Sequence, residues 1–536
     1  MKLSASLRVK AFRLALSASH SGASLHTEIP DPTAGAENVE LTIIPMKKTI
    51  PVKPVLHIVL IAVLLCFRHI PVDAQDTARL ERLQRAVDKE LSTPLFRKVI
   101  AAVEISEAET GRILYAHNSR VLLRPASNAK LFATAAALWT LPSDFRFRTE
   151  LAFDESSSGA PALWVIGGGD PLLSTKDVER LATAVSETGI PTISAICLDL
   201  TAFDSVLYNP AWMLEDVGED YCTPVTALSF ERNVSPVRLR GGTRQGERVS
   251  VDTDSCRGSD ILVDAVTGRG VEARVIPCRA IDVREENRTN RPGRPYHRIT
   301  GSVPAGTLKT VTVATWDPPA HAACTLASAL RAFGIETPDR PAATGKVPIR
   351  RRSIAAVERG LDEVLAAVNR SSDNLAAECL LKTIGLAVEG LGSWACGLLA
   401  MASCFHRMGI DTASIRLVDG SGLSHGNLVS VSAIGSLLRT MYRSSAAKRF
   451  IASLAQPGSG TMMSRLKNVE GADYVHAKTG TLNGVSSLSG YVLPPQGVPL
   501  VFSITMQNFA GDHAPFRAVQ DNIVGHCLRY SLSAGR

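Results

Sequence analysis

Several patterns that would place a protein in a common functional class are missing from this sequence. Its ten cysteines show no C-x-x-C spacing, so we find no zinc or thiol-redox motif, and no other set of metal ligands is apparent. The glycine run Gly167–Gly169 lacks the Lys-Ser/Thr of a phosphate loop, and we interpret it as a turn. The densest basic cluster, from Arg284 to Arg298, has no accompanying aromatic platform on which bases could stack. We therefore expect a solvated loop there, no nucleic-acid partner, no metal and no cofactor.

A long membrane-spanning run is missing as well. The apolar stretch Val55–Phe67 has 13 residues, which is short for a membrane span. It follows the basic Met46-Lys47-Lys48 and precedes Val72-Asp73-Ala74, where small residues stand at the positions that a signal peptidase reads. This is the layout of a secretory signal peptide.

We therefore expect translation to start at Met46 and residues 46–74 to form the signal peptide. The mature chain would begin near Gln75 and work in the periplasm or another extracytoplasmic compartment. Residues 1–45 would then be an untranslated or disordered extension. The alternative is an uncleaved leader, and only in that case do we expect association with a membrane.

What is present describes an ordinary globular protein. Of the 536 residues, 45% are hydrophobic and 20% are charged, and the net charge of +7 is spread along the chain. This length predicts two or more domains. Cys66 lies in the leader, so nine cysteines remain after processing (10 − 1), and at least one is free or pairs with another molecule. Cys256 and Cys278 are candidates for a bridge within one module, although spacing alone does not determine connectivity.

The segment that organises the chain is Arg124–Lys130, which contains Ser127 and Lys130 in S-x-x-K spacing. It precedes the apolar run Leu131–Trp139, which predicts a buried helix, and Pro125 and Ser127 both favour a helix start. Three residues apart on a first turn, Ser127 and Lys130 share a face. A serine hydroxyl needs a neighbouring base to become a nucleophile, and a lysine can serve only if burial or a nearby cation lowers its pKa. By itself, S-x-x-K is a weak signal.

Two more motifs follow in order. Ser372-Asp373-Asn374 lies between two amphipathic helical runs, and Lys478-Thr479-Gly480-Thr481 follows a strand-like segment. S-x-x-K, S-D-N and K-T-G in this order are the signature of penicillin-binding proteins and class A β-lactamases. Together the three motifs are a strong signal for a serine nucleophile that a lysine activates.

The spacing of the motifs predicts the domain organisation. Between Ser127 and Ser372 lie 245 positions (372 − 127), and from residue 145 the pattern changes to short β-rich runs. We predict an inserted pair of β-rich domains over residues 145–348. The main domain would then have a first part over 75–144 and a second part over 349–536.

The second part of the main domain is predicted to be helical first and β-rich later. Arg350–Arg352 is interpreted as a basic linker, and helical periodicity predicts a helix over 354–369. Strand-like runs follow the third motif, and a helix closes the chain.

With these motifs and the long insert, the chain resembles serine-type penicillin-binding proteins, in particular the D-alanyl-D-alanine carboxypeptidase/endopeptidase branch with extra domains inside the transpeptidase fold. Further matching stretches are Gly167–Leu172, Trp212–Asn233 and Asp419–Leu423, and the resemblance covers roughly Gln75 to the C-terminus. It implies an α/β (α+β) fold, with a β-lactamase/transpeptidase-like domain built from an antiparallel sheet and helices. It also implies action on peptidoglycan stem peptides through an acyl-enzyme, and covalent inhibition by penicillins and other β-lactam antibiotics.

The resemblance implies catalytic roles for four residues. Ser127 would attack the carbonyl between two D-alanines, and Lys130 would accept its proton. Ser372 would relay a proton to the leaving D-alanine. Asn374 would hold the substrate amide and Lys130. Asp373, between the last two, is expected to cap the following helix.

The third motif would hold the substrate. Lys478 and Thr479 would bind its terminal carboxylate, on the strand that continues through Gly480, and the amides of Ser127 and Thr481 would form the oxyanion hole. Asp216 is a candidate contact for the amine of a diamino acid, with a plain surface carboxylate as the alternative. His476 is expected to be an outward-facing strand residue, and Asp419 and Ser421 are expected to shape a rim loop.

Two alternatives share these motifs. A class A β-lactamase would hydrolyse its acyl-enzyme with a glutamate in an E-x-x-L-N loop, but no glutamate between the second and third motifs begins that pattern: Glu378, Glu389 and Glu470. Glu378 comes nearest, but Lys382 stands where the asparagine should be. A non-catalytic peptidoglycan-binding scaffold would not require an intact base. Carboxypeptidase and endopeptidase activity cannot be separated from sequence, because they differ only in the group that leaves.

Overall fold

The computed structural model describes residues 74–533 except 157–158, 254–255, 257, 280–294 and 339. The expected extension over 1–45 and nearly all of the expected signal peptide lie outside the described residues, as does most of the basic cluster after Arg284. Within the described part of the chain, no helix is both long and apolar enough to span a bilayer.

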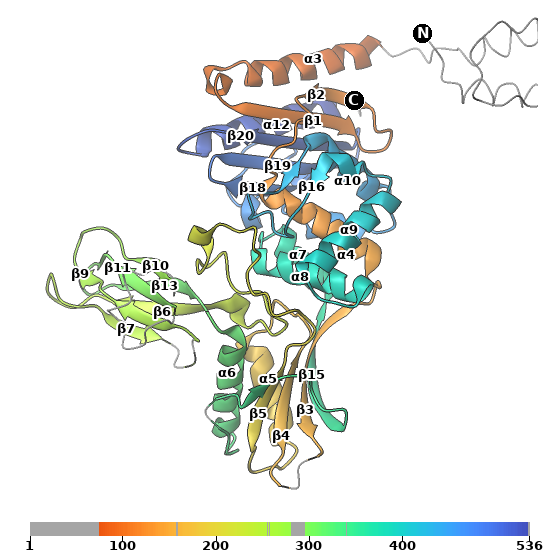
Figure 1. Cartoon of the computed structure of the whole chain (residues 1–536). Helices are drawn as coiled ribbons and strands as arrows, with labels where there is room; N and C mark the ends of the chain where they lie inside the picture. Colours follow the sequence, from red (N-terminus) through yellow and green to blue (C-terminus); the bar gives the residue numbers. More distant parts are fainter. Residues whose placement is uncertain are drawn as a thin grey trace, which may run out of the picture. The chain divides into compact units, whose positions relative to one another are not determined.

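The domain that carries the three motifs is built on a five-stranded antiparallel sheet, in the order β18-β19-β20-β1-β2 (Figure 1). Its strands come from both ends of the chain: β1 Ile100–Glu107, β2 Ile113–His117, β18 Val475–Leu482, β19 Val485–Val492 and β20 Leu500–Gln507. β1 pairs with β20 along its whole length, from Ile100 opposite Gln507 to Glu107 opposite Leu500. This pairing joins the two parts of the domain and confirms the expected antiparallel sheet.

Helices cover both faces of this sheet, which is why β19 and β20 are buried at every residue. α3 Ala74–Leu91 and α12 Ala514–Leu532 share one apolar core with the sheet, where Val87 and Ile523 join Phe502. α10 Val431–Tyr442 packs on the other face, where the hydroxyl of Tyr491 donates to the carbonyl of Leu438 over 2.7 Å. Alternate positions of each strand thus serve two different cores.

The remaining helices form a lobe around α4 Lys130–Thr140. Residues 130–137 are buried without exception, so the first two turns of α4 are enclosed on all sides, as the apolar sequence predicts, whereas Trp139 near its end is 40% exposed. The helices that enclose it are α7 Leu361–Asn369, α8 Asn374–Glu389, α9 Trp394–Arg407 and α11 Ala447–Ser453. α4 therefore gives the S-x-x-K motif a fixed base.

The insert consists of two modules, and the inner module is inserted into the sequence of the outer one. The outer module is a mixed sheet in the order β14-β5-β4-β3-β15 with two helices. Its elements are β3 Arg146–Asp154, β4 Ala162–Gly167, α5 Thr175–Ser186, β5 Ala195–Asp199, α6 Pro318–Ala332, β14 Ala343–Thr344 and β15 Arg351–Gly360. It has its own hydrophobic core, in which Leu181 and Leu326 from the helices meet Leu163. Because the helices supply much of this core, the outer module is α/β in character. The inner module is built from short strands in its described residues.

The prediction of a helix over 354–369 is wrong in its first half. Residues 351–360 form β15, which pairs antiparallel with β3, and the helix begins only at Leu361. The apolar run from Ile354 to Val357 fits a helix or a strand, and hydrogen bonds to a distant strand decided between them. The predicted boundary at Pro348 therefore falls before the last strand of the insert's sheet, and Arg351 and Arg352 belong to that strand rather than to a linker.

The inner module consists of short strands around a separate core that includes Val237, Leu239 and Ile299. Its strands are β6 Val234–Arg240, β7 Ser250–Thr253, β8 Asp260–Val263, β9 Val266–Thr267, β10 Arg274–Cys278, β11 Tyr296–Thr300, β12 Ser302–Val303 and β13 Leu308–Ala314. They form sheets in the orders β13-β6-β7, β10-β11-β8 and β12-β9.

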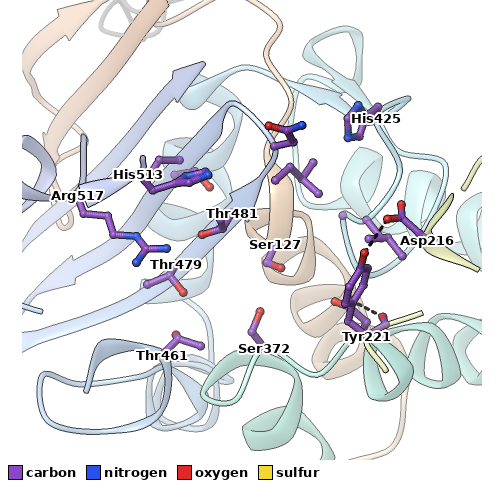
Figure 2. Close-up of a pocket in the computed structure, with 18 of the residues that line it drawn as sticks. Ser127, Asp216, Tyr221, Ser372, His425, Thr461, Thr479, Thr481, His513 and Arg517 are labelled. Atoms are coloured by element: carbon purple, nitrogen blue, oxygen red, sulfur yellow. Dashed lines mark hydrogen bonds between the residues drawn. The ribbon is translucent and has the colours of Figure 1, made fainter. Parts of the chain in front are cut away.

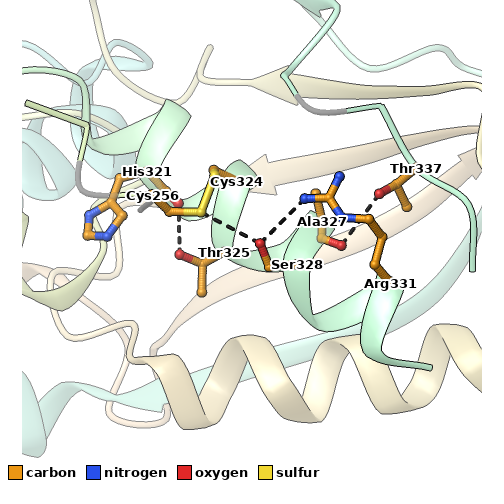
Figure 3. Close-up of a disulfide and its surroundings, with 8 residues drawn as sticks. All are labelled: Cys256, His321, Cys324, Thr325, Ala327, Ser328, Arg331 and Thr337. Carbon is orange, nitrogen blue, oxygen red and sulfur yellow. Dashed lines mark hydrogen bonds between the residues drawn. A yellow bond between two sulfur atoms is a disulfide. The ribbon is translucent and has the colours of Figure 1, made fainter. Parts of the chain in front are cut away.

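A disulfide ties the inner module to the outer one (Figure 3). Cys256, in the loop before β8, is bonded to Cys324 of α6. The expected bridge between Cys256 and Cys278 is therefore wrong. Cys278 ends β10, where Tyr296 is its strand partner, whereas the sulfur of Cys256 lies beside α6, 3.6 Å from Oγ of Ser328.

Candidate active site

Ser127 lies in the 3₁₀ turn η2 Ala126–Ala129, directly before α4. The residue before it, Ala126, has a φ of 49°, a left-handed conformation that residues with a side chain seldom adopt outside functional sites. The turn is held from the strand side, where the hydroxyl of Ser487 donates to the carbonyl of Pro125 over 2.8 Å. The chain therefore presents the Ser127 hydroxyl from a constrained loop on a rigid helix.

Two glycines are required by the closeness of this turn to its neighbours. A Cβ at Gly480 would lie 3.0 Å from the amide nitrogen of Ser127 and 2.2 Å from the hydroxyl of Ser487. A Cβ at Gly422, whose φ is +81°, would lie 1.9 Å from the carbonyl oxygen of Ala126. Gly480 of K-T-G therefore lets β18 approach the turn that carries Ser127, and Gly422 lets the 419–424 loop approach the same turn.

Lys130 has no exposed surface, and its amine has three acceptors. Nζ lies 3.0 Å from Oγ of Ser127, 2.6 Å from Oδ1 of Asn374 and 2.7 Å from the carbonyl oxygen of Ser421. Burial lowers the pKa of Lys130 to about 8, against the opposing effect of nearby carboxylates, of which Glu378 is the strongest. A lysine with this pKa is partly neutral at ordinary pH and can accept the Ser127 proton.

A second buried lysine faces the second motif serine. Nζ of Lys478, also without exposed surface, donates to Oγ of Ser372 and to the carbonyl of Thr479, each over 2.8 Å. Burial, and then the charge of Lys130, hold the pKa of Lys478 well below its ordinary value. Ser372 has a φ of 60°, so it too is displayed from a strained turn. The arrangement allows protons to pass between the Ser372 hydroxyl and an amine.

Asn374 connects Lys130 to the insert. It is the first residue of α8; its Oδ1 accepts from Lys130, and its Nδ2 donates to the carbonyl of Tyr221 over 2.8 Å. Asp373 caps α8 by accepting from the amide of Ala376 over 3.1 Å, as predicted. Asn374 therefore orients Lys130 from one side and fixes the insert segment that carries Tyr221 from the other.

The sequence did not reveal the role of two buried carboxylates behind Lys130. Glu378 accepts from the amides of Gly420 and Ser421 over 3.0 and 2.7 Å and from the indole of Trp394 over 2.7 Å. Asp419 accepts from the amide of Ser424 over 2.7 Å, and from further donors of the same loop and the indole of Trp212. Burial raises the pKa of Glu378 to about 7, with Asp419 as the next cause.

These carboxylates fix the carbonyl of Ser421 and, through it, the amine of Lys130. Asp419 and Ser421 were expected to shape a rim loop; they do belong to a loop, but both are fully buried, and the carbonyl of Ser421 contacts Lys130. The signal available in the sequence was the spacing of α8, on which Glu378 stands four residues after Asn374 and so shares its face.

The motif residues line one cavity of about 850 Å³ (Figure 2). Of the predicted site residues, Ser127, Ser372, Asn374, Thr479, Gly480, Thr481 and Asp216 line it, whereas Lys130 and Lys478 lie behind its wall. His476 is outside the cavity, half-buried, with its Nε2 3.4 Å from the side-chain amide of Gln456. Ser127 is thus open to a ligand, whereas the amines of Lys130 and Lys478 are not.

The two ends of the cavity carry opposite charges. At one end, Glu215 and Asp216 belong to the short turn η3 Leu214–Asp216, and the hydroxyl of Tyr221 donates to Oδ1 of Asp216 over 2.9 Å. At the other end lies Arg517 (Figure 2), and Arg465 lies beside it and donates to its carbonyl oxygen over 3.3 Å. No group of three or more potential metal ligands occurs among the described residues.

Known proteins share this chain's sequence and fold. A model of the D-Ala-D-Ala carboxypeptidase 3 (S13) family matches residues 83–529. The chain is 34% identical over 478 residues to a D-alanyl-D-alanine carboxypeptidase of Actinomadura sp. (strain R39), over 85% of this chain and 86% of that protein. It is 24% identical over 437 residues to the D-alanyl-D-alanine carboxypeptidase DacB of Haemophilus influenzae, over 78% of this chain and 89% of that protein.

The fold agrees with this similarity. The crystal structure of penicillin binding protein 4 (dacB) from Haemophilus influenzae superposes with a TM-score of 0.71 at 22% identity, over 82% of this chain and 99% of that one. It therefore shares the transpeptidase-like fold and its additional sheets. With the family model covering both parts of the motif-bearing domain and the insert between them, the chain belongs to the D-Ala-D-Ala carboxypeptidase 3 (S13) family of penicillin-binding serine peptidases.

Proposed function

We propose that this serine carboxypeptidase cleaves the D-Ala-D-Ala bond of peptidoglycan stem peptides through an acyl-enzyme on Ser127. The observation that carries the proposal is the amine of Lys130, 3.0 Å from Oγ of Ser127 and without exposed surface. In acylation, the Ser127 oxygen bonds to the carbonyl carbon of the penultimate D-alanine, and its proton passes to Lys130. The peptide C–N bond then breaks, and the leaving amine takes a proton through Ser372.

The oxyanion of the tetrahedral intermediate would be held by the amides of Ser127 and Thr481. Both residues line the cavity, and Thr481 follows the glycine that lets β18 approach the nucleophile. One such donor contributes about 10²–10³ in rate. Hydrolysis of the acyl-enzyme by water then returns Ser127 and completes the reaction.

Asp216 gives the site a preference on the acyl side. We propose that its carboxylate binds the free ammonium group of a diamino acid in the stem peptide. It is half-buried in the cavity wall, and the hydroxyl of Tyr221 orients Oδ1, which leaves Oδ2 for a ligand. A carboxylate in this setting attracts an ammonium group more strongly than one on the open surface.

The position of Glu378 argues against the alternative that this protein is a β-lactamase. A deacylating glutamate must reach a water molecule beside the acyl-enzyme. Both carboxylate oxygens of Glu378 are bound by amides of the 419–424 loop and by Trp394, and Glu378 does not line the cavity. The protein should therefore form a long-lived adduct with penicillins.

The test combines two measurements. Labelling with a fluorescent penicillin shows whether Ser127 is acylated, and a non-catalytic scaffold would remain unlabelled. Digestion of purified muropeptides, with products identified by mass, shows whether D-alanine or a whole cross-linked peptide leaves. If neither D-alanine nor a peptide is released from any muropeptide, the proposal is refuted.

We further propose that the protein is exported, on the basis of the basic, apolar and small-residue pattern from Met46 to Ala74. The disulfide Cys256–Cys324 supports this, since such bonds persist in oxidising compartments. N-terminal sequencing of the mature protein tests the leader. A start near Gln75 is expected, and residues 1–45 on the mature chain would contradict it.

A further inference from the structure

At the leaving-group end of the cavity, the terminal carboxylate of the substrate needs a positively charged partner. This end lies beyond Ser127 from Asp216, and Thr479, Thr481, His513 and Arg517 line it (Figure 2). The motif resemblance assigns the carboxylate to Lys478 and Thr479. The position of Lys478 does not suit that role.

Lys478 is behind the cavity wall. Its side chain has no exposed surface, and its amine is already bound to Ser372 and to the carbonyl of Thr479. A ligand carboxylate could reach it only after these contacts were broken. Lys478 can contribute a field to the site, but the residue that lines the cavity beside it is Thr479.

Arg465, the second cation at this end, is neutralised. Its guanidinium bonds to both carboxylate oxygens of Asp521, with Nε at 2.9 and 3.1 Å, and further to Gln520. Its side chain is almost entirely buried, with 8% exposed. An arginine held in this way supports the wall and offers no free donor pair to a ligand.

Arg517 differs from both. It stands in the first turn of α12, is exposed, and lines the same cavity, and no described residue forms an ion pair or hydrogen bond with its guanidinium. Figure 2 shows the guanidinium turned toward Thr479. The neighbouring His513 adds little charge, because burial, and then Arg517, lower its pKa. A free arginine fork beside threonine hydroxyls is suited to a carboxylate.

We propose that Arg517 binds the free α-carboxylate of the leaving D-amino acid, together with the hydroxyls of Thr479 and Thr481. The ligand class is a D-amino acid with a free carboxylate, either D-alanine itself or the D-centre of a cross-linking diamino acid. An amidated leaving group would lose this contact. The inference rests on the proposed acyl-transfer reaction at Ser127 and assigns its leaving-group specificity.

The same arrangement explains how the substrate is oriented. Glu215 and Asp216 make one end of the cavity negative, and Arg517 makes the other end positive. A peptide with an ammonium group on its acyl side and a carboxylate on its leaving side fits in one direction only. That direction places the scissile carbonyl across Ser127.

The experiment compares two substrates that differ only in this carboxylate. We measure kcat/KM for an acyl-D-Ala-D-Ala peptide and for the same peptide ending in D-alaninamide, with the wild type, Arg517→Gln and Arg517→Lys. Arg517→Gln is expected to lower kcat/KM for the acid by about 10- to 100-fold, since a hydrogen bond between charged groups is lost. The amide should change less than about threefold. Arg517→Lys should be intermediate, because it keeps the charge but loses the fork.

If the amide substrate turns over too slowly to measure, a second pair of ligands is used. Acylation by benzylpenicillin and by its methyl ester is followed by mass spectrometry of the adduct. Arg517→Gln should slow acylation by the acid and leave the ester nearly unchanged. Equal losses for acid and amide, or for acid and ester, would mean that Arg517 only supports the fold, and an unchanged preference for the acid would also overturn the proposal.

The matched control is Arg529→Gln. Arg529 is an exposed arginine on the same helix, its guanidinium contacts His526, and it does not line the cavity. This variant should behave as the wild type with all four ligands. Failure of the reaction itself is distinguishable, because the wild type would then form no adduct with either β-lactam.

Discussion

Beneath the active site, the motif-bearing domain buries two lysines and two carboxylates without any exposed surface: Lys130, Lys478, Glu378 and Asp419. In the described part of the inner module, the Asp, Glu, Lys and Arg side chains instead stay at least partly exposed. Arg238 and Asp252, for example, pair over 2.8 Å while 54% and 70% of their side chains remain exposed. Burial of ions is expensive, and surface pairs contribute little to stability.

This difference between the two regions indicates that the buried charges serve the chemistry of the site rather than the stability of the fold. A stable fold does not require them, since apolar groups of similar shape usually serve as well or better. In this domain burial lowers the pKa of Lys130 to about 8, which makes an amine usable as a base. The hydrogen bonds of Glu378 and Asp419 to the 419–424 loop offset part of the cost and fix the geometry. Four predictions test this contrast between the buried and the exposed charges.

The largest effect is expected at Ser127 and Lys130. Ser127→Ala should abolish penicillin labelling and reduce peptide cleavage on the order of 10⁴-fold or more. Lys130→Arg should be nearly as inactive, because arginine keeps the charge but does not release its proton at working pH. The labelling rate of Lys130→Arg decides between a base and a fixed charge, and near-normal labelling would refute the proposed base.

A loss of one buried carboxylate should be smaller but should change the pH profile. In the wild type, acylation should rise with pH through about 8, as Lys130 loses its proton. The negative charge of Glu378 raises the pKa of Lys130, so Glu378→Gln should move this rise to lower pH. It should also slow acylation about 10- to 100-fold and destabilise the fold by about 3 kcal/mol, because buried donors lose their charged acceptor.

The control for this variant is Glu389→Gln, on the exposed C-terminal end of the same helix. Acylation rates between pH 6 and 10 and thermal unfolding are measured for both. A pH profile that stays in place in Glu378→Gln would mean that Glu378 supports the loop without acting on Lys130.

An intermediate effect is expected at Asp216, whose carboxylate is half-buried at the cavity wall. Asp216→Asn keeps an acceptor for the hydroxyl of Tyr221 and removes the charge. It should lower kcat/KM about tenfold for peptides with a free ammonium group on the diamino acid, and leave the acetylated peptides almost unchanged. Equal kcat/KM losses for the two kinds of peptide would contradict the assigned contact.

The smallest effect is expected at the surface pair of the inner module. Arg238→Gln should change the free energy of unfolding by less than about 1 kcal/mol, since solvent screens a pair this exposed. Its kcat/KM should equal that of the wild type. A destabilisation as large as that of Glu378→Gln would remove the contrast between the two regions.

Local pattern predicted some elements and failed at others for a definite reason. The helix after Ser127 was predictable because its residues are apolar on every face. Residues 354–360 of β15 were predicted to be the start of a helix because the partner strand β3 lies about 200 residues earlier in the chain. The partner of Cys256 was missed for the same reason, as Cys324 lies 68 residues away on a helix.

The sequence by itself determined the family, and the order of S-x-x-K, S-D-N and K-T-G predicts the nucleophile, its base and the strand that holds the substrate. Those residues must keep their identity and local spacing, and both can be read directly. Only the tertiary structure decided which amines face the ligand and which are buried, because burial depends on chain segments far apart in sequence. Packing places Glu378 and Asp419 behind Lys130 and puts Lys478 behind the wall. It leaves the Arg517 guanidinium in the cavity without a partner among the described residues.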